Sequence, residues 1–180
     1  MVRQLNWLED TNQWDLFSVQ PKAQCEVYAC CGPFGICTRD SVEFCECLPG
    51  FEPRFPEEWK LQDRSRGCVR KADLQCLNGS HAHGERDQFL MVSNVRLPEY
   101  PIVLQARSAM ECESVCLNNC SCSAYAYDGE ECTVWGGDLL NVEQLSDDDS
   151  NARSFYIKLA DSELNRTRKR KGSHNCCCRT

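Results

Sequence analysis

The sequence lacks a long apolar segment. No run of apolar residues approaches the roughly 18 residues that a membrane-spanning helix requires. The opening residues, Met1 to Asn6, contain no apolar core of the kind that defines a secretory signal peptide. The cysteines described below need an oxidising compartment, yet the chain carries no signal that would take it there. We therefore interpret it as a fragment or as the product of an incomplete gene model.

Patterns for catalysis and metal binding are also scarce. The chain has three histidines, and it has no Cys-x2-Cys pair of the kind that zinc knuckles and thiol oxidoreductases use. His81 and His83, with Glu85 and Asp87, form the one cluster that resembles a metal site, but nothing in the sequence fixes its geometry. We interpret this cluster and the acidic triplet 147–149 as solvated loops. The Gly-rich loop, His-Arg-Asp and Asp-Phe-Gly motifs of protein kinases are missing. We expect no catalytic residue, no metal and no cofactor.

Basic charge is scarce in the body of the chain. The net charge of the whole chain is -7, but residues 165–180 hold six of the 20 Lys and Arg residues and no acidic residue. Residues 1–164 therefore carry a net charge of -13. A nucleic-acid partner requires clustered Lys and Arg on a folded face, so this acidic body argues against one.

Cysteine, in contrast, is abundant. The chain has 16 cysteines in 180 residues, and thirteen of them lie between Cys25 and Cys132 at irregular spacings. This density is typical of small secreted domains whose hydrophobic cores are too thin to be stable without disulfides. The sequence therefore predicts a framework of disulfides rather than zinc sites.

Turn residues and cysteines divide the chain into four segments. Residues 1–24 are rich in aromatic residues and predict two strands that belong to a larger sheet. Residues 25–75, called the first unit here, hold seven cysteines among glycines and prolines, which predicts short strands and loops. Residues 76–160, the second unit, combine strands with one helix, and residues 161–180 form a basic tail. The expected fold class is small, disulfide-rich and mainly β, with an antiparallel sheet crossed by one helix.

The second unit gives the clearest local signals. Ser108 and Glu111 form a capping box, in which each side chain satisfies a free backbone N–H, and a helix of about ten residues follows and ends near Asn118. Asp128 and Gly129 predict a hairpin turn. The expected strands are 88–92, 101–104, 122–127, 132–135 and 154–159.

The first unit contains the run Cys25-x5-Cys31-Gly32-x2-Gly35-x-Cys37-x7-Cys45-x-Cys47-x2-Gly50-Phe51, closed by Cys68. This cysteine spacing resembles that of an epidermal growth factor-like module. In the Cys-x-Cys-x2-Gly-Phe ending, two cysteines on one strand bridge in opposite directions and the glycine permits the turn. The gap between Cys47 and Cys68 implies an enlarged last loop. No acidic cluster precedes Cys25, so the calcium-binding version of the module is not expected.

The second unit carries a more specific resemblance. Its central run is Glu111-Cys112-Glu113-x2-Cys116-Leu117-x-Asn119-Cys120-Ser121-Cys122-x-Ala124-Tyr125, followed by Cys132 and Trp135-Gly136. This run resembles the PAN/apple region of plant S-locus glycoproteins and of G-type lectin S-receptor-like serine/threonine kinases. Two further segments share the resemblance, Gly67-Cys68-Val69-Arg70 and the closing Leu159-Ala160-Asp161-Ser162-Glu163-Leu164. Residues 1–24 are similar to the end of the S-locus glycoprotein domain, so the resemblance covers residues 1–164. The lectin domain, membrane helix and kinase of the full receptors are absent from this sequence.

The resemblance implies a pairing scheme for twelve cysteines. Cys30 is left over, either as a free thiol or as a partner in an intermolecular bridge. No implied bond crosses between residues 25–68 and 76–132. The implied pairs are Cys25–Cys37, Cys31–Cys45, Cys47–Cys68, Cys112–Cys132, Cys116–Cys122 and Cys76–Cys120.

Two further features concern modification and the tail. Three N-x-[ST] sequons lie at Asn78, Asn119 and Asn165, and Asn78 is the favoured glycan site because Asn119 adjoins a bridged cysteine. The basic, cysteine-containing tail could be a lipid anchor or a nuclear signal, but an oxidised ectodomain contradicts both. A disordered tail is favoured.

The resemblance implies an extracellular recognition and association module of a plant receptor, in pollen recognition or in defence-type signalling. Its expected partner is a second copy, a related receptor or a secreted peptide, and the membrane enters only through parts of the receptor missing here. The alternative is a secreted cysteine-rich protein that acts alone as a decoy. Because side chains alternate along a strand, we expect Tyr125 and Tyr127 to point outward as interface anchors, with Ala124 and Ala126 toward the helix. The competing interpretation is that the aromatics close the core against the helix.

Overall fold

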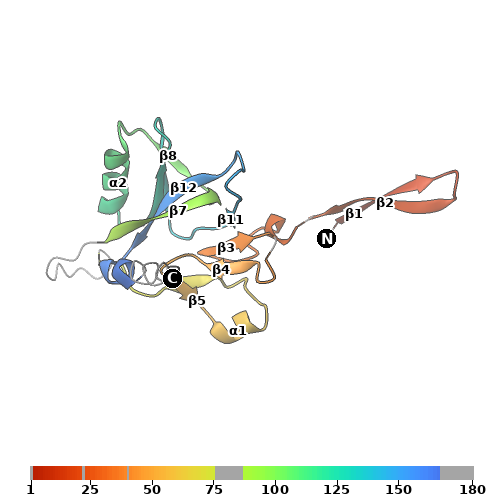
Figure 1. The fold of residues 1–180 in the computed structure, drawn as a ribbon, viewed down its shortest axis with the longest axis horizontal. Coiled ribbons are helices and arrows are strands. Elements are labelled where there is room, and N and C mark those ends of the chain that lie inside the picture. The colour runs from red at the N-terminus through yellow and green to blue at the C-terminus, as the bar shows by residue number, and fades with distance from the viewer. Residues whose placement is uncertain (1, 22, 40, 76–86, 167–180) are drawn as a thin grey trace, which may run out of the picture.

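The computed structural model describes residues 2–21, 23–39, 41–75 and 87–166. The first described elements are the two predicted strands, β1 (Val2–Leu8) and β2 (Gln13–Gln20), which pair as an antiparallel hairpin. They form a two-stranded sheet of their own in this structure, not part of a larger sheet. Figure 1 shows this hairpin extending away from the rest of the molecule. Trp7 and Trp14 face each other across it, with ring centroids 5.3 Å apart, and both remain exposed. The hairpin therefore has no core of its own.

The first unit consists of short elements, as expected. After the short helix η1 (Gln24–Glu26) come β3 (Gly35–Thr38) and β4 (Cys45–Cys47), which pair antiparallel. A second pair follows, formed by β5 (Phe51–Pro53) and β6 (Cys68–Arg70). The enlarged loop between them contains α1 (Pro56–Lys60), a helical turn that the sequence analysis did not predict. Pro56 at its first position and acidic residues in its first turn favour this turn.

The second unit contains every strand predicted for it, plus one more. Its helix is α2 (Ala109–Asn118), with the predicted length. The unpredicted strand is β11, which has only three residues. The strands are β7 (Gln88–Arg96), β8 (Ile102–Leu104), β9 (Cys122–Tyr127), β10 (Cys132–Gly136), β11 (Val142–Gln144) and β12 (Arg153–Leu159).

The predicted capping box forms at the start of α2. The Ser108 hydroxyl accepts a hydrogen bond from the backbone N–H of Glu111 at 3.2 Å. The Glu111 carboxylate accepts in return from the backbone N–H of Arg107 at 2.7 Å, one residue before the position that a standard capping box uses. Two backbone donors that the helix cannot satisfy internally are thus satisfied.

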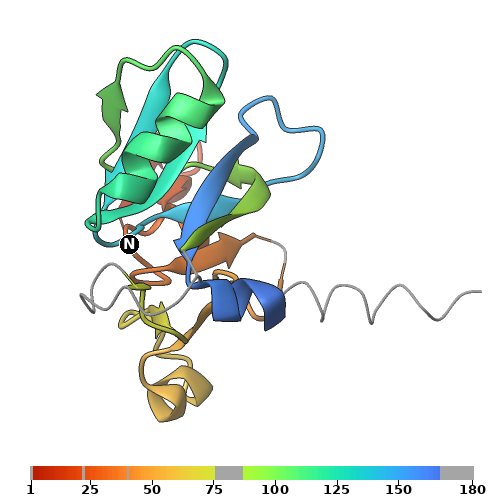
Figure 2. The same ribbon diagram turned by 90° about the vertical axis from the view of Figure 1, so that its left-hand side faces the viewer.

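The two units share one sheet. Its strand order is β4-β3-β11-β7-β12-β9-β10-β8, so strands of the first unit occupy one end and β8 the other. The connection is β11, which pairs parallel with β3 and antiparallel with β7. Figure 2 shows α2 lying across the strands of the second unit, on the side away from the first unit. The shared sheet makes the units one structural body.

The main hydrophobic core also draws on both units. Phe34 and Phe51 of the first unit stack with ring centroids 4.5 Å apart. The same cluster contains Trp135 and Phe155 of the second unit, as well as Leu164 from the helical turn at residues 161–166. A core that neither unit completes alone explains how such thin units remain folded.

The predicted orientation of the β9 tyrosines is wrong. Tyr125 is buried under α2, where its hydroxyl donates to Glu113 at 3.1 Å. Ala124 and Ala126 face the main core on the opposite side of the sheet. The reason lies in the register, because Cys132 is paired with Tyr127 across β10 and β9 and its side chain bonds to Cys112 of the helix. Paired residues share a face, so the helix lies on the tyrosine side.

Neither tyrosine is therefore an exposed interface anchor. The Tyr125 ring is stacked on Tyr156, with centroids 4.8 Å apart, and Phe89 meets it edge-on. Tyr127 is half-buried beside the same helix, and its hydroxyl donates to the backbone oxygen of Gly129 at 3.0 Å. The competing interpretation, that aromatics close the core against the helix, describes both residues.

Candidate functional site: a cysteine cluster at the junction of the two units

The described residues form five disulfides, all between pairs that the family resemblance implied. Three lie in the first unit and two hold α2 against the sheet. No bond among them crosses between the units. The pairs are Cys25–Cys37, Cys31–Cys45, Cys47–Cys68, Cys112–Cys132 and Cys116–Cys122.

The sixth implied bond stays a prediction. Cys120 is exposed and bonds to no other described cysteine. Its implied partner, Cys76, lies outside the described residues.

Five cysteines of the first unit gather in a small volume, called the cysteine cluster here. A tight turn brings them together. In this turn the N–H of Gly32 donates to the backbone oxygen of Ala29 at 2.9 Å, and the N–H of Gly35 donates to the backbone oxygen of Gly32 at 3.3 Å. Gly32 has a φ of +63°, and a side chain at this position would collide with the backbone of Gly67. Asn141 fixes the turn from the second unit by accepting from the N–H of Ala29 at 2.6 Å. The cluster comprises Cys25, Cys30, Cys31, Cys37 and Cys45.

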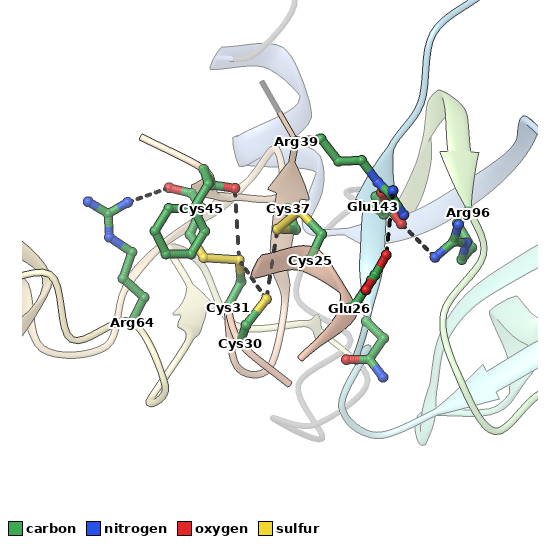
Figure 3. Close-up of a disulfide and its surroundings, with 12 residues drawn as sticks. Cys25, Glu26, Cys30, Cys31, Cys37, Arg39, Cys45, Arg64, Arg96 and Glu143 are labelled. Carbon is green, nitrogen blue, oxygen red and sulfur yellow. Dashed lines mark hydrogen bonds and ion pairs between the residues drawn. A yellow bond between two sulfur atoms is a disulfide. The ribbon is translucent and has the colours of Figure 1, made fainter. Parts of the chain in front are cut away.

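Cys30 is the unbonded member of this cluster. Its Sγ atom lies 3.7 Å from Sγ of Cys31 and 3.8 Å from Sγ of Cys37, so one thiol touches two different disulfides (Figure 3). The side chain is half-buried, and this burial raises the pKa of the thiol, to which the nearby Glu143 carboxylate adds. The thiol form is therefore favoured at neutral pH.

Three sulfur atoms of the cluster are close enough to surround a metal ion. The Sγ atoms of Cys30, Cys31 and Cys45 lie within 4.8 Å of one another. Metal ions bind cysteine as the thiolate, however, and Cys31 and Cys45 are bonded to each other. In the oxidised protein this group therefore provides one thiol and no metal site.

A buried carboxylate lies next to the cluster and joins the units. Glu143 of β11 is 2% exposed and pairs with Arg39, which follows β3, and with Arg96 of β7. Nη1 of Arg96 lies 2.6 Å from Oε2 of Glu143, and Arg39 also approaches Glu26 at 3.9 Å. The hydrogen bond and charge of Glu143 raise the pKa of the Arg39 guanidinium. Figure 3 shows this charged group beside the disulfides.

Further contacts hold the first unit against β12. The Arg70 guanidinium donates to the backbone oxygen of Lys158 and lies 4.9 Å from the centroid of the Phe51 ring. Gly50 has a φ of +86°, and a Cβ atom there would lie 2.5 Å from Cδ2 of Leu159. Close packing with a positive φ requires glycine at this turn. Ion pairs, a hydrogen bond and apolar packing thus all cross the junction.

Several predicted site residues lie elsewhere. Asn119 is exposed and its side-chain oxygen accepts from the N–H of Ser121 at 3.0 Å. Asn165 is also exposed and donates to Asp161 at 3.0 Å. Asp87, which the sequence analysis assigned to a solvated loop, is buried instead, and its carboxylate accepts from the N–H of Gln75 at 3.0 Å. Outside the described residues lie Asn78, His81, His83, Glu85 and residues 167–180.

An exposed apolar surface at the far end of the sheet was missed by the sequence analysis. Ile102 and Val103 of β8 are each more than half exposed, and so are Tyr100 just before the strand and Tyr28 of the first unit. The two tyrosine hydroxyls lie 3.2 Å apart. We call these four residues the edge patch. Among the described residues, no helix is long and apolar enough to cross a membrane.

Comparisons with known proteins match this arrangement. The model of the S-locus glycoprotein domain matches residues 1–55, and that of the PAN-like domain matches residues 76–142. The chain is 44% identical over 165 residues to the G-type lectin S-receptor-like serine/threonine-protein kinase At2g19130 of Arabidopsis thaliana, covering 91% of this chain and 19% of the relative. The kinases At1g61500 and SD1-29 of the same plant are 37% and 36% identical, over 88% and 91% of this chain and 19% and 20% of their own lengths.

The resemblance indicated by the cysteine motifs is therefore confirmed. The chain spans about a fifth of the length of the curated relatives it matches, and neither matching family model describes a kinase domain. The fold class is likewise confirmed as a small, disulfide-rich, mainly β structure with a PAN-like domain.

Proposed function

We propose that this chain is an extracellular, non-enzymatic association module of an S-domain receptor-like kinase, and that its second unit pairs two receptor chains. The similarity to receptor kinases supports the receptor assignment. The five disulfides support an oxidising, extracellular location. This pairing serves a receptor that acts in pollen recognition or in defence-type signalling. A secreted peptide is a further partner.

The edge patch carries the proposal. β8 is the outermost strand of the eight-stranded sheet at this end, and the outer side of an edge strand offers N–H and C=O groups for pairing with another chain. Natural proteins usually protect such an edge with charges, whereas Ile102 and Val103 leave apolar groups on it. An antiparallel pair of two identical strands is two-fold symmetric, so a second copy or a close relative fits this edge.

The test is the association state of the oxidised full chain, measured by analytical ultracentrifugation. We expect the unmodified chain to dimerise at micromolar concentration, and Ile102→Lys to weaken dimerisation about tenfold or more through burial of a charge. Val103→Lys samples the opposite face of the strand. Leu61→Lys is the matched control, because Leu61 is 82% exposed but lies in the first unit, outside the edge patch.

A second control, Trp14→Ser, distinguishes association through the exposed N-terminal hairpin from association through the edge patch. A chain that stays monomeric at high micromolar concentration contradicts the proposal. So does a dimer that Trp14→Ser disrupts and Ile102→Lys leaves intact.

A further inference from the structure

We propose that Cys30 is the nucleophile of an internal thiol–disulfide exchange that opens the Cys25–Cys37 bond, so that the free thiol of the cysteine cluster moves from Cys30 to Cys25. The exchange does not depend on the proposed receptor pairing. It places the free thiol on a residue that lines a surface cavity.

The geometry selects which disulfide reacts. Cys30 contacts one sulfur of each neighbouring disulfide, Sγ of Cys31 at 3.7 Å and Sγ of Cys37 at 3.8 Å. Attack on Cys31 would join adjacent residues, whose Cα atoms lie about 3.8 Å apart across a trans peptide, below the roughly 4.4 to 6.8 Å usual for disulfides. Attack on Cys37 meets no such restriction, and the two sulfur atoms need to approach by less than about 2 Å to reach bonding distance. Sγ of Cys45 also lies within 4.8 Å of Sγ of Cys30. Cys37 is the contacting sulfur whose bond to Cys30 would not join adjacent residues, so we take it as the electrophilic sulfur.

The step is balanced without an external oxidant or reductant. The Cys30 thiol loses its proton to solvent, and the thiolate attacks Sγ of Cys37. A Cys30–Cys37 bond forms while the Cys25–Cys37 bond breaks, and Cys25 leaves as a thiolate that takes up a proton. One disulfide and one thiol are present before and after, so no electron is gained or lost overall.

The product differs from the starting state in the cavity that the free thiol lines. Cys25 lines a surface cavity of about 380 Å³ together with Arg39 and Phe44. The released Cys25 thiol can therefore react with a low-molecular-weight disulfide that enters this cavity. Loss of the Cys25–Cys37 bond also removes the covalent link between β3 and the segment that follows the N-terminal hairpin.

The charges around the cluster keep the exchange slow in the resting protein. Burial and the Glu143 carboxylate of β11 disfavour the Cys30 thiolate, and Glu26 of η1 adds negative charge nearby. Arg39 and Arg96 offset these carboxylates through their ion pairs. Because the thiolate is the attacking species, the exchange rate rises with pH.

The test is a disulfide map of the oxidised full chain, incubated at mildly alkaline pH with iodoacetamide and then digested. Chymotrypsin cleaves after Tyr28 and Phe34, which separates Cys25 from the Cys30–Cys31 pair and both from Cys37. Without exchange, the label is on Cys30. With exchange, the Cys25 fragment carries the label, and fragment 29–34 is bonded to the fragment that contains Cys37.

Two variants make the result decisive. Cys30→Ser should lower labelling of Cys25 by about tenfold or more, whereas Cys120→Ser should leave it unchanged, because Cys120 lies in the other unit. Cys25→Ser leaves Cys30 and Cys37 as free thiols, and oxidised glutathione should join them. Cys25 labelling that is equal in the Cys30→Ser variant overturns the proposal. So does a Cys25→Ser chain whose other four disulfides map correctly while Cys30 and Cys37 stay reduced.

Discussion

Lys158 of β12 gives the sharpest test of how the second unit is held together. Its side chain is fully buried, and its Nζ donates to the backbone oxygens of Cys116 at 2.6 Å and of Asn119 at 2.9 Å. These oxygens lie at the C-terminal end of α2, where the last carbonyls lack the regular helical donor four residues further on. Each accepts instead from one backbone N–H at the helix end and from Lys158. A basic group at this end also interacts favourably with the helix dipole. Lys158 thus links the C-terminal end of α2 to strand β12 of the sheet.

The substitution Lys158→Met keeps the length of the side chain and removes both hydrogen bonds. Each carbonyl keeps a backbone donor, the N–H of Asn119 at 3.2 Å for Cys116 and the N–H of Cys122 at 2.9 Å for Asn119. A hydrogen bond from a charged group contributes about 1.5 to 3 kcal/mol, and relief from burying the ammonium offsets part of the sum. We expect a net loss of about 2 to 4 kcal/mol in the free energy of unfolding. A loss of about 3 kcal/mol corresponds to a melting temperature lowered by roughly 6 to 12 °C for a protein of this size.

The assay is thermal and urea unfolding of the oxidised chain, followed by circular dichroism. Lys60→Met is the matched control, because Lys60 is exposed and pairs with Glu57 on the surface, where such an ion pair contributes little. A Lys158→Met variant that melts together with the Lys60→Met variant would show that the helix end needs no donor from β12, and the reasoning would be wrong.

Three further predictions concern the core and the junction. Burial and the hydrogen-bonded carboxylate on α2 raise the pKa of Tyr125 above its ordinary value of about 10, so its neutral form stabilises the fold below pH 10 and this contribution is lost as the pH rises further. The absorbance change that accompanies tyrosine ionisation should therefore be the same in the folded Tyr125→Phe variant and in the unmodified chain up to about pH 11. A variant that lacks one tyrosine ionisation below that pH would contradict this prediction. Glu143→Gln should lower the free energy of unfolding by about 1 to 3 kcal/mol. The loss is smaller than for a fully buried ion pair because Arg39 and Arg96 are half-exposed. Urea unfolding identical to that of the unmodified chain would refute this prediction. Gly50→Ala should destabilise more than Gly137→Ala. Both glycines have a positive φ, but only at Gly50 would the added Cβ atom lie 2.5 Å from Cδ2 of Leu159; equal losses would count against the packing argument.

Local signals in the sequence predicted the elements well. The capping residues placed α2, and the hairpin turn at Asp128 and Gly129 placed β9 and β10. These features depend on neighbouring residues, so the sequence itself contains the information. The disulfide pairs came from the family resemblance, because spacing alone permits many connectivities.

What was missed depends on contacts between distant residues. β11 has three residues and no alternating pattern, and it is a strand only because β3 and β7 lie on its two sides. The tyrosine orientation required the register between Cys132 and Tyr127, which no local pattern gives. The edge patch likewise became visible only once β8 was placed at the end of the sheet.

The same three-residue strand connects the junction to the cysteine cluster. Glu143 is directly opposite Cys37 in the β11–β3 pair, and opposite Arg96 in the β11–β7 pair. The exchange therefore replaces Cys25 by Cys30 as the disulfide partner of Cys37, while the backbone of Cys37 stays paired with β11. Cys25, which has no such support from the sheet, is the end that is released. The junction should thus survive the exchange, and the freed segment should be the one that leads to the N-terminal hairpin.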